Sequence, residues 1–290
     1  MYTINILTKA DWTAYRNLMF QWIMPQLDGL HALDRLLMVG MESAEGPVGL
    51  AVLELDPDER CATVHCLFVA AAHRRRGLAA RLMGTARLHC AKRNIASMKF
   101  AYYSGKAITP AVEAWLHKEG WTEPQREAVV FHIDSTIAGA PWLRDRPLPH
   151  GLHMLPWIDI DQEDREQLAA GRTHAYPAFL SPFKTFAQLE QTNSLGLMSA
   201  SGIEGWCMAY RLAAETILYD AVFVSPQYQQ SGLALVMLSR SISLQLEKGI
   251  PFGMFTVNTS TPAMMKLARQ WLAPYARMMS EKRSCYLQLT

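Results

Sequence analysis

Two loops of similar sequence supply residues that could hold an anion. The first runs from Val69 to Ala79 (VAAAHRRRGLA) and the second, 155 residues later, from Val224 to Ala234 (VSPQYQQSGLA). Each follows an apolar strand-like run and opens a helix-like run. Small residues at a helix N-terminus present backbone N–H groups, and the helix dipole favours negative charge there. The repeat therefore predicts a duplicated domain, each copy holding a phosphorylated ligand.

Composition argues against several other classes of partner. The 290 residues include 28 basic and 26 acidic side chains, a formal net charge of +2, which gives no bias toward nucleic acid or a membrane surface. No apolar stretch approaches the roughly 20 residues of a membrane span, and the start lacks a signal-peptide pattern. We therefore expect a cytoplasmic protein of two domains.

Cysteine and histidine spacing does not favour a metal site. The five cysteines contain no CxxC pair, and the nine histidines contain no HxH or HxxxH pattern. We expect these cysteines to be buried free thiols in a reducing compartment. A nucleophilic Cys66 is the alternative that remains open.

The elements that must position the two loops follow the same order in both halves. The first half predicts strands at 2–7, 36–42, 48–55, 61–69, 97–102 and 128–133. It also predicts a helix that begins at Trp12 with Asp11 as its cap, and helices at 78–93 and 110–119. The second half predicts strands at 152–158, 195–200, 205–212, 216–224, 252–257 and 284–289, with helices at 161–170, 233–248 and 262–271. We expect domains at 1–137 and 151–290, joined by a proline-containing linker at 138–150.

Both halves resemble the GNAT superfamily of acyl-CoA N-acyltransferases. The carrying motif is [Gln/Arg]-x-x-Gly-x-[Gly/Ala] after a strand that ends in Val. It occurs as Arg74-x-x-Gly77-x-Ala79 and as Gln229-x-x-Gly232-x-Ala234. The tandem arrangement is similar to that of enzymes such as mycothiol synthase. The resemblance implies an α/β (α+β) fold in each half, a mixed, mostly antiparallel twisted sheet flanked by helices.

The resemblance implies acetyl-CoA or coenzyme A as co-substrate, without a metal. The pyrophosphate would meet the loop, and the pantetheine arm would pair with the strand before it. The implied binding residues are Leu67, Phe68, Val69, Arg74, Arg75, Arg76, Gly77, Leu78 and Ala79 in the first half, and Val222, Phe223, Val224, Gln229, Gln230, Ser231, Gly232, Leu233, Ala234 and Asn258 in the second.

The two loops differ in charge. The first holds three consecutive arginines, whereas the second, with Gln229, Gln230 and Ser231, has none. The arginines could also indicate a nucleic-acid patch, but a wider basic face would be needed. Coenzyme A phosphates explain them more simply. We expect the first half to bind coenzyme A more tightly.

Acyl transfer to an amine needs a base for the amine and an acid for the thiolate. The family often places a Glu four residues before the Val of the loop, and His65 and Asp220 occupy those positions. A polar residue satisfied within the sheet is the alternative for each. The tyrosine that often serves as general acid in this family is replaced by Leu116 in the first half and by Ala268 in the second. Tyr102, Tyr103 and His117 are the candidates to replace it.

The acceptor is expected to be a small-molecule amine, with no nucleic acid or membrane partner and a monomer or homodimer as the assembly. Aromatic and proline-rich segments at 20–29 and 174–183 could line its pocket, or they could simply pack in the core. The first half is the better equipped for catalysis, although enzymes like mycothiol synthase tend to use the second. The alternative function is a catalytically weak acyl-CoA-binding or scaffold module.

Overall fold

The chain forms two compact α/β units. The computed structural model describes residues 1–20, 23–24, 27–171, 174–184 and 188–289. The first unit combines Met1–Glu127 with Glu281–Thr290, and the second spans Ala128–Ser280. Each contains a mostly antiparallel sheet flanked by helices, as the sequence predicts.

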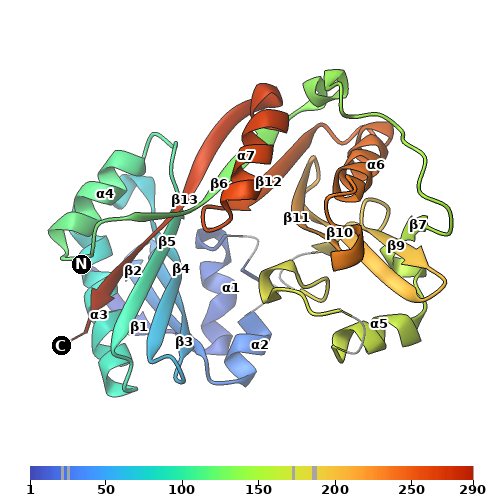
Figure 1. Ribbon diagram of the computed structural model, residues 1–290. Helices are drawn as coiled ribbons and strands as arrows, with labels where there is room; N and C mark the ends of the chain where they lie inside the picture. Colours follow the sequence, from blue (N-terminus) through green and yellow to red (C-terminus); the bar gives the residue numbers. More distant parts are fainter. Residues whose placement is uncertain (21–22, 25–26, 172–173, 185–187, 290) are drawn as a thin grey trace. The chain divides into compact units, whose positions relative to one another are not determined.

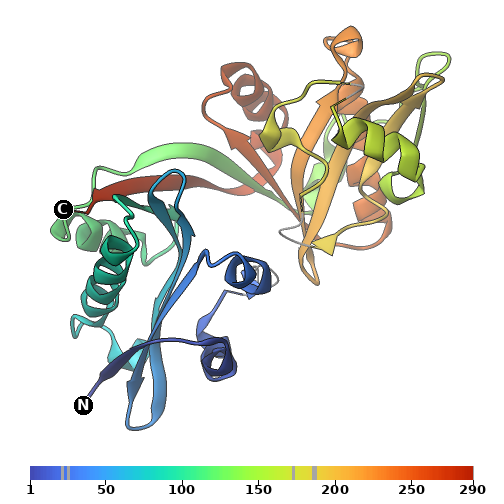
Figure 2. The ribbon, with the colours of Figure 1, turned by 90° about the horizontal axis from the view of Figure 1, so that it is seen from below.

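The first unit has helices on both faces of its sheet (Figures 1 and 2). Its strands lie in the order β1 (Thr3–Ile6), β2 (Leu36–Ser43), β3 (Gly46–Asp56), β4 (Cys61–Val69), β5 (Ser97–Tyr103) and β13 (Ala276–Gln288). Helices α3 (Leu78–Lys92) and α4 (Thr109–Lys118) cover one face, and the short α1 (Trp12–Tyr15) and α2 (Leu27–Ala32) the other. Leu78, Leu82 and Ala86, spaced one turn apart on α3, are buried against the sheet.

The second unit repeats this plan. Its strands lie in the order β6 (Gln125–Ile133), β12 (Phe252–Asn258), β11 (Thr216–Val224), β10 (Gly202–Ala213), β9 (Leu195–Ser199) and β7 (His153–Pro156), and the short β8 (Gln188–Leu189) pairs with β10. Its helices are α5 (Gln162–Ala169), α6 (Leu233–Glu247) and α7 (Pro262–Trp271). Leu233 and Met237 of α6 lie in the core, as the helical spacing predicts.

The last strand of each half pairs within the other unit. Residues 282–288 of β13 pair with β5, and residues 128–133 of β6 pair with β12. Cys285 of β13 is buried in the core of the first unit, while Phe131 and Ile133 of β6 are buried in that of the second. The strand order along the sequence instead predicts that each of these strands closes its own half. An alternating apolar pattern sets which face of a strand is buried, but it does not name the neighbouring strand.

The region expected as a linker packs into the second unit. Ile137, Ala140 and Trp142 are buried there, and the Trp142 indole Nε1 donates a hydrogen bond to the carbonyl of Trp271 at 3.0 Å. The compact units therefore divide the chain differently from the expected ranges 1–137 and 151–290. Trp142 could have signalled this, because a large aromatic side chain seldom lies in an exposed connector.

The first helix is shorter than its pattern suggests. Helix α1 ends at Tyr15 and is followed by a 3-10 turn, Arg16–Leu18. Asp11 does not cap α1; its carboxylate instead accepts hydrogen bonds from the backbone N–H and hydroxyl of Thr8. The spacing of Tyr15, Leu18, Met19 and Trp22 by three and four residues predicts a longer amphipathic helix, and Trp22 lies outside the described residues.

The strand pairing yields a test by deletion. A chain that ends at Ser280 loses the strand beside β5, so the amides of Ser97–Tyr103 should lose most of their protection from hydrogen exchange. The amides of β12 should keep theirs, because β6 and β11 still flank that strand. Exchange measured by mass spectrometry would contradict the pairing if protection were lost in β12 instead.

Candidate active sites at the two strand–loop–helix junctions

The two repeated loops have the same backbone conformation. Each begins with a 3-10 turn, Ala71–His73 or Pro226–Tyr228. Arg75 (φ 63°) and Gln230 (φ 70°) are left-handed, and so are Gly77 (φ 73°) and Gly232 (φ 82°) at the N-caps of α3 and α6. Glycine adopts this conformation without strain, whereas Arg and Gln do so at a cost. Both loops therefore hold a non-glycine residue in an unfavourable backbone conformation, which directs the chain to a helix N-terminus.

The first residue of each motif is tied back to its own strand. Arg74 Nε donates to the carbonyl of Val69 at 2.9 Å, and Gln229 Nε2 donates to that of Val224 at 3.3 Å. The Arg74 guanidinium also lies 5.9 Å from the centre of the Phe68 ring. Arg and Gln can replace one another here because both offer an N–H to the same carbonyl.

The remaining loop residues differ between the units. Arg75 and Arg76 are exposed, and Arg76 Nη1 donates to the Tyr2 hydroxyl at 3.0 Å. In the second loop, the Ser231 hydroxyl donates to the carbonyl of Tyr228 and accepts the backbone N–H of Leu233 at 3.3 Å. An internal partner thus takes one of the first amides of α6, which would otherwise be offered to an anion.

The strand before each loop separates from its parallel neighbour. Pairing of β4 with β5 runs from Cys61 to Val64, and pairing of β11 with β12 from Thr216 to Tyr219. Beyond these points Leu67–Val69 and Val222–Val224 pair only on their other side, with β3 and β10. Each unit therefore contains an opened strand edge that leads to its loop.

His65 and Asp220 are the first residues after the strands part, and each is the extra residue of a β-bulge. A bulge interrupts the ladder and redirects a side chain, and such bulges are frequent beside active sites. The two positions predicted from sequence are thus equivalent in the two units. What surrounds them is different.

His65 is paired with a carboxylate from the neighbouring strand. Its Nε2 lies 2.8 Å from Glu54 Oε2 on β3, and the imidazole is 18% exposed. The hydrogen bond to His65 is the main cause that lowers the pKa of Glu54. Sequence analysis missed Glu54. A lone carboxylate in the apolar run Val52-Leu53-Glu54-Leu55 was the available signal.

Asp220 is paired with a lysine. Its Oδ2 lies 2.5 Å from Lys184 Nζ, and the two side chains are 17% and 24% exposed. Burial raises the pKa of Asp220, and Lys184 opposes that rise. The sequence contains no signal for Lys184, because it lies 36 positions away in a segment without regular secondary structure.

A second buried carboxylate, also missed, organises the start of the second loop. Glu204 of β10 is 3% exposed and accepts hydrogen bonds from Ser225, Gln227 and Ser199, the closest being Ser225 Oγ at 2.6 Å. Burial alone would raise the pKa of Glu204, but these hydrogen bonds outweigh it and lower the pKa. Its contacts identify it as a structural anchor.

The positions that lack the family's tyrosine are apolar and buried. Leu116 is 1% exposed and Ala268 5%. Of the three candidate replacements, Tyr102 donates its hydroxyl proton to Glu113 Oε1 at 2.6 Å, and burial raises the pKa of both Tyr102 and Tyr103. A raised pKa keeps these hydroxyls protonated, but their contacts do not direct them to the opened strand edge.

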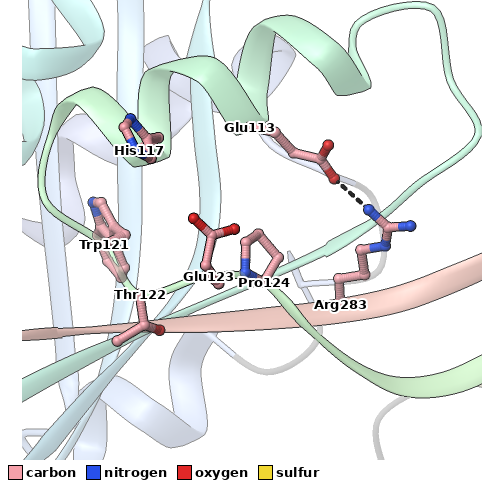
Figure 3. Close-up of a pocket in the computed structure, with 7 residues that line it drawn as sticks. All are labelled: Glu113, His117, Trp121, Thr122, Glu123, Pro124 and Arg283. Carbon is pink, nitrogen blue, oxygen red and sulfur yellow. Dashed lines mark hydrogen bonds and ion pairs between the residues drawn. The ribbon is translucent and has the colours of Figure 1, made fainter.

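His117, the third candidate, lines a small hollow of about 180 Å³ in the first unit (Figure 3). The other lining residues are Glu113, Trp121, Thr122, Glu123, Pro124 and Arg283, and Arg283 is ion-paired with Glu113 at 2.7 Å. None of them belongs to β4 or to the loop after it. The hollow is also smaller than the roughly 300 Å³ of a typical ligand pocket.

Asn258, expected to contact the coenzyme, organises the turn after β12. Its Oδ1 accepts the backbone N–H of Ser260 at 2.9 Å, and its carbonyl accepts the hydroxyl of Thr261 at 2.7 Å. The side-chain oxygen is therefore already used within the turn.

The segments expected to line an acceptor pocket are only partly described. In the first, residues 21–22 and 25–26 lie outside the described residues, and Phe20 is exposed. In the second, Tyr176 packs edge-on against Trp206 with ring centres 4.9 Å apart, and the Trp206 indole donates to the carbonyl of Leu180 at 2.8 Å. These contacts place the second segment against β10 as packing.

The cysteines show no sign of nucleophilic chemistry. All five are free thiols, and burial raises the pKa of Cys66 to about 12, which leaves a negligible thiolate fraction at neutral pH. Within the described part of the chain, no three His, Cys, Asp or Glu side chains gather as metal ligands. Nor is any described helix long and apolar enough to cross a membrane.

Comparison with known proteins agrees with this geometry. Residues 4–120 match the model of the acetyltransferase (GNAT) family. No sequence match is found among curated proteins. The matching region contains β4, the first loop, α3 and α4.

Similar solved structures extend the match to the whole chain. A tandem GNAT protein from the clavulanic acid biosynthesis pathway, solved without acetyl-CoA, aligns with a TM-score of 0.73 at 14% identity, over 100% of this chain and 99% of that one. A GCN5-related N-acetyltransferase from Sphaerobacter thermophilus aligns with a TM-score of 0.62 at 15% identity, over 99% and 96% of the two chains. A probable N-acyltransferase from Enterococcus faecalis gives 0.57 at 12% identity, over 100% and 72%.

At these identities the structural matches establish the fold, and the family model matches residues 4–120 of the chain. Together with the duplicated loop and opened strand edge, they identify the chain as a tandem GNAT-fold protein whose residues 4–120 match the acetyltransferase family.

Proposed function

We propose that the protein is an acyl-CoA-dependent N-acyltransferase that transfers an acyl group, acetyl in the first instance, to the amine of a small molecule. The main support for this proposal is that each unit combines an opened strand edge with a loop that leads into the N-terminus of a helix and its backbone N–H groups. The structural neighbours named as N-acetyltransferases support the reaction class.

Coenzyme A has two chemical features that this arrangement suits. Its pyrophosphate needs convergent N–H donors and positive potential, which the start of α3 or α6 offers. Its pantetheine arm carries amides that can pair with an open strand edge, here Leu67–Val69 or Val222–Val224. The thioester would then arrive near the bulge at His65 or Asp220.

We propose that the first unit catalyses transfer to the external amine. Its loop carries Arg75 and Arg76, and its bulge residue His65 is held by Glu54. Because a carboxylate only accepts hydrogen bonds, Glu54 places a hydrogen on His65 Nε2 and fixes the orientation of the imidazole. Glu54 would also stabilise the imidazolium that forms when the amine proton is taken.

The departing group lowers the need for a dedicated acid. A thiol has a reference pKa of about 8.5, so a thiolate leaves more readily than an alkoxide or amide. Direct attack of the amine on the thioester can then proceed with Leu116 at the position where the family often has tyrosine. Peptide N–H groups near Val69 are our candidates for binding the developing oxyanion.

A specific observation favours a different role for the second unit, as an acyl-CoA-binding module. Lys184 holds Asp220 in an ion pair at 2.5 Å. This contact occupies the carboxylate that an external amine would need as its base. We further propose that the repeat at 1–137 and 151–290, with 138–150 between, reflects duplication of one GNAT domain.

Replacing a charged residue of the first loop with its neutral counterpart from the second loop tests the coenzyme site. Arg75→Gln should weaken coenzyme A binding about tenfold and flatten its salt dependence, because one charge-assisted hydrogen bond contributes about 1.5 kcal/mol. Gln suits the left-handed conformation of this position, since Gln230 adopts it at the equivalent position of the second loop. Calorimetry on the full chain at two salt concentrations measures this. An unchanged affinity and salt slope in Arg75→Gln would refute the assignment of the first loop.

Replacing the proposed base tests the chemistry. His65→Gln should lower thiol release with an accepted amine by about 100-fold, the usual contribution of a general base. Glu54→Gln should lower it less, because the amide oxygen can still accept the hydrogen of His65 Nε2 although the carboxylate charge is lost. Asp220→Asn is the matched variant in the second unit and should leave turnover near that of the unmodified chain. The reverse pattern would assign catalysis to the second unit.

A further inference from the structure

Lys184 has an unusual position for a lysine. Its ammonium donates to Asp220 Oδ2 at 2.5 Å and to the carbonyl of Phe179 at 2.6 Å. Its own carbonyl accepts the hydroxyl of Tyr210 at 3.3 Å. With 24% of the side chain exposed, the amine is held in one place within the second unit while solvent still reaches it.

The amine is held where an acceptor amine would have to be. Asp220 is the residue at which β11 leaves β12, so the opened strand edge starts beside it. Val224, where the loop begins, lies four residues on, which is roughly 13 Å along a strand. A thioester carried along this edge from a pyrophosphate at the Gly232 loop would come to Asp220, and therefore to Lys184.

The surroundings favour proton transfer between the two side chains. The pair adjoins Tyr210, whose hydroxyl donates to the Lys184 carbonyl, and Tyr210 belongs to the buried cluster that also contains Trp206, Ala221 and Phe223. An apolar environment of this kind strengthens the hydrogen bond and disfavours separated charges. Burial correspondingly raises the pKa of Asp220, which makes it a better proton acceptor.

We propose that Lys184 is a self-acylation site: the second unit transfers the acyl group of a bound acyl-CoA to its own Lys184 Nζ. This inference rests on the proposed function only in requiring that the second loop bind acyl-CoA. It assigns the ion pair a chemical role, with Asp220 as the base and Lys184 as the nucleophile.

The step is balanced without another reagent. Asp220 takes one proton from the Lys184 ammonium, and the resulting amine attacks the thioester carbonyl. A C–N bond forms, the C–S bond breaks, and the electron pair leaves on the coenzyme A thiolate. The second nitrogen proton is lost as the amide forms and passes to the thiolate. The products are Nε-acyl-Lys184 and coenzyme A, and the neutral amide no longer forms an ion pair with Asp220.

The first unit contains a matched control. Lys99 is similarly enclosed, with 27% of its side chain exposed and its Nζ 2.5 Å from Glu127 Oε1. It lies on β5 opposite Thr63, inside the paired part of the sheet. Lys9 is a second control, an exposed lysine that reports the uncatalysed background reaction with acetyl-CoA in solution.

The experiment is incubation of the full chain with acetyl-CoA, followed by intact mass and peptide mapping. We expect one acetyl group per chain, on Lys184, formed at least tenfold faster than on Lys99 or Lys9. Lys184→Arg should abolish this modification, and Lys99→Arg should not. Asp220→Asn should slow it about 100-fold, the scale expected for loss of a general base. The urea-unfolded chain should acetylate all three lysines at similar rates.

Two results would overturn the inference. One is acetylation of Lys184 that is no faster than that of Lys9. The other is a rate of Lys184 acetylation in Asp220→Asn that equals the rate in the unmodified chain. Calorimetry on the Arg75→Gln chain, with its first loop weakened, separates these failures from failure of the proposed function. Coenzyme A binding there without modification of Lys184 rejects self-acylation alone. Absence of coenzyme A binding by any form of the chain rejects the proposed function and self-acylation with it.

Discussion

The separation of two parallel strands is the constraint on which both candidate sites depend. Backbone N–H and C=O groups are normally paired in a sheet, so strands that part expose groups that need another partner. In each unit the parting begins at a β-bulge, whose extra residue, His65 or Asp220, is turned away from regular pairing. The same break therefore creates a strand edge for an extended ligand and places an ionisable side chain at its start. The left-handed residues of the following loop complete the arrangement by directing backbone to a helix N-terminus.

The two units share this backbone arrangement and differ in the side chains on it. Arg74 and Gln229 make the same hydrogen bond to the end of the preceding strand, which shows what the motif needs structurally. The bulge residues have instead acquired different partners, a carboxylate for His65 and an ammonium for Asp220. A histidine beside a carboxylate suits repeated proton transfer from an external amine. A carboxylate beside a lysine holds an amine of its own, which is why we assign different chemistry to the second unit.

The exchanged strands bear on how such a chain can be studied. Each unit has part of its core supplied by the distant end of the other half, Cys285 in one case and Phe131 and Ile133 in the other. A fragment cut between the two sequence repeats would lack a strand that its sheet requires. Questions about the separate sites are therefore better answered with substitutions in the full chain than with isolated halves.

His65 and Asp220 came from the family resemblance, whereas local patterns in the sequence were sufficient for most strands and helices, the internal repeat and the two loops. These depend on helical or alternating periodicity and on glycines at left-handed positions, which neighbouring residues determine. The tertiary structure alone decided which strand β6 and β13 join, that residues 138–150 pack into a core, and that Glu54 and Lys184 reach the bulges. Each of these is a contact between distant residues, and an apolar or charged side chain specifies that it needs a partner without specifying which. The identity of the partner, and with it the different surroundings of His65 and Asp220, is set only when the chain is folded.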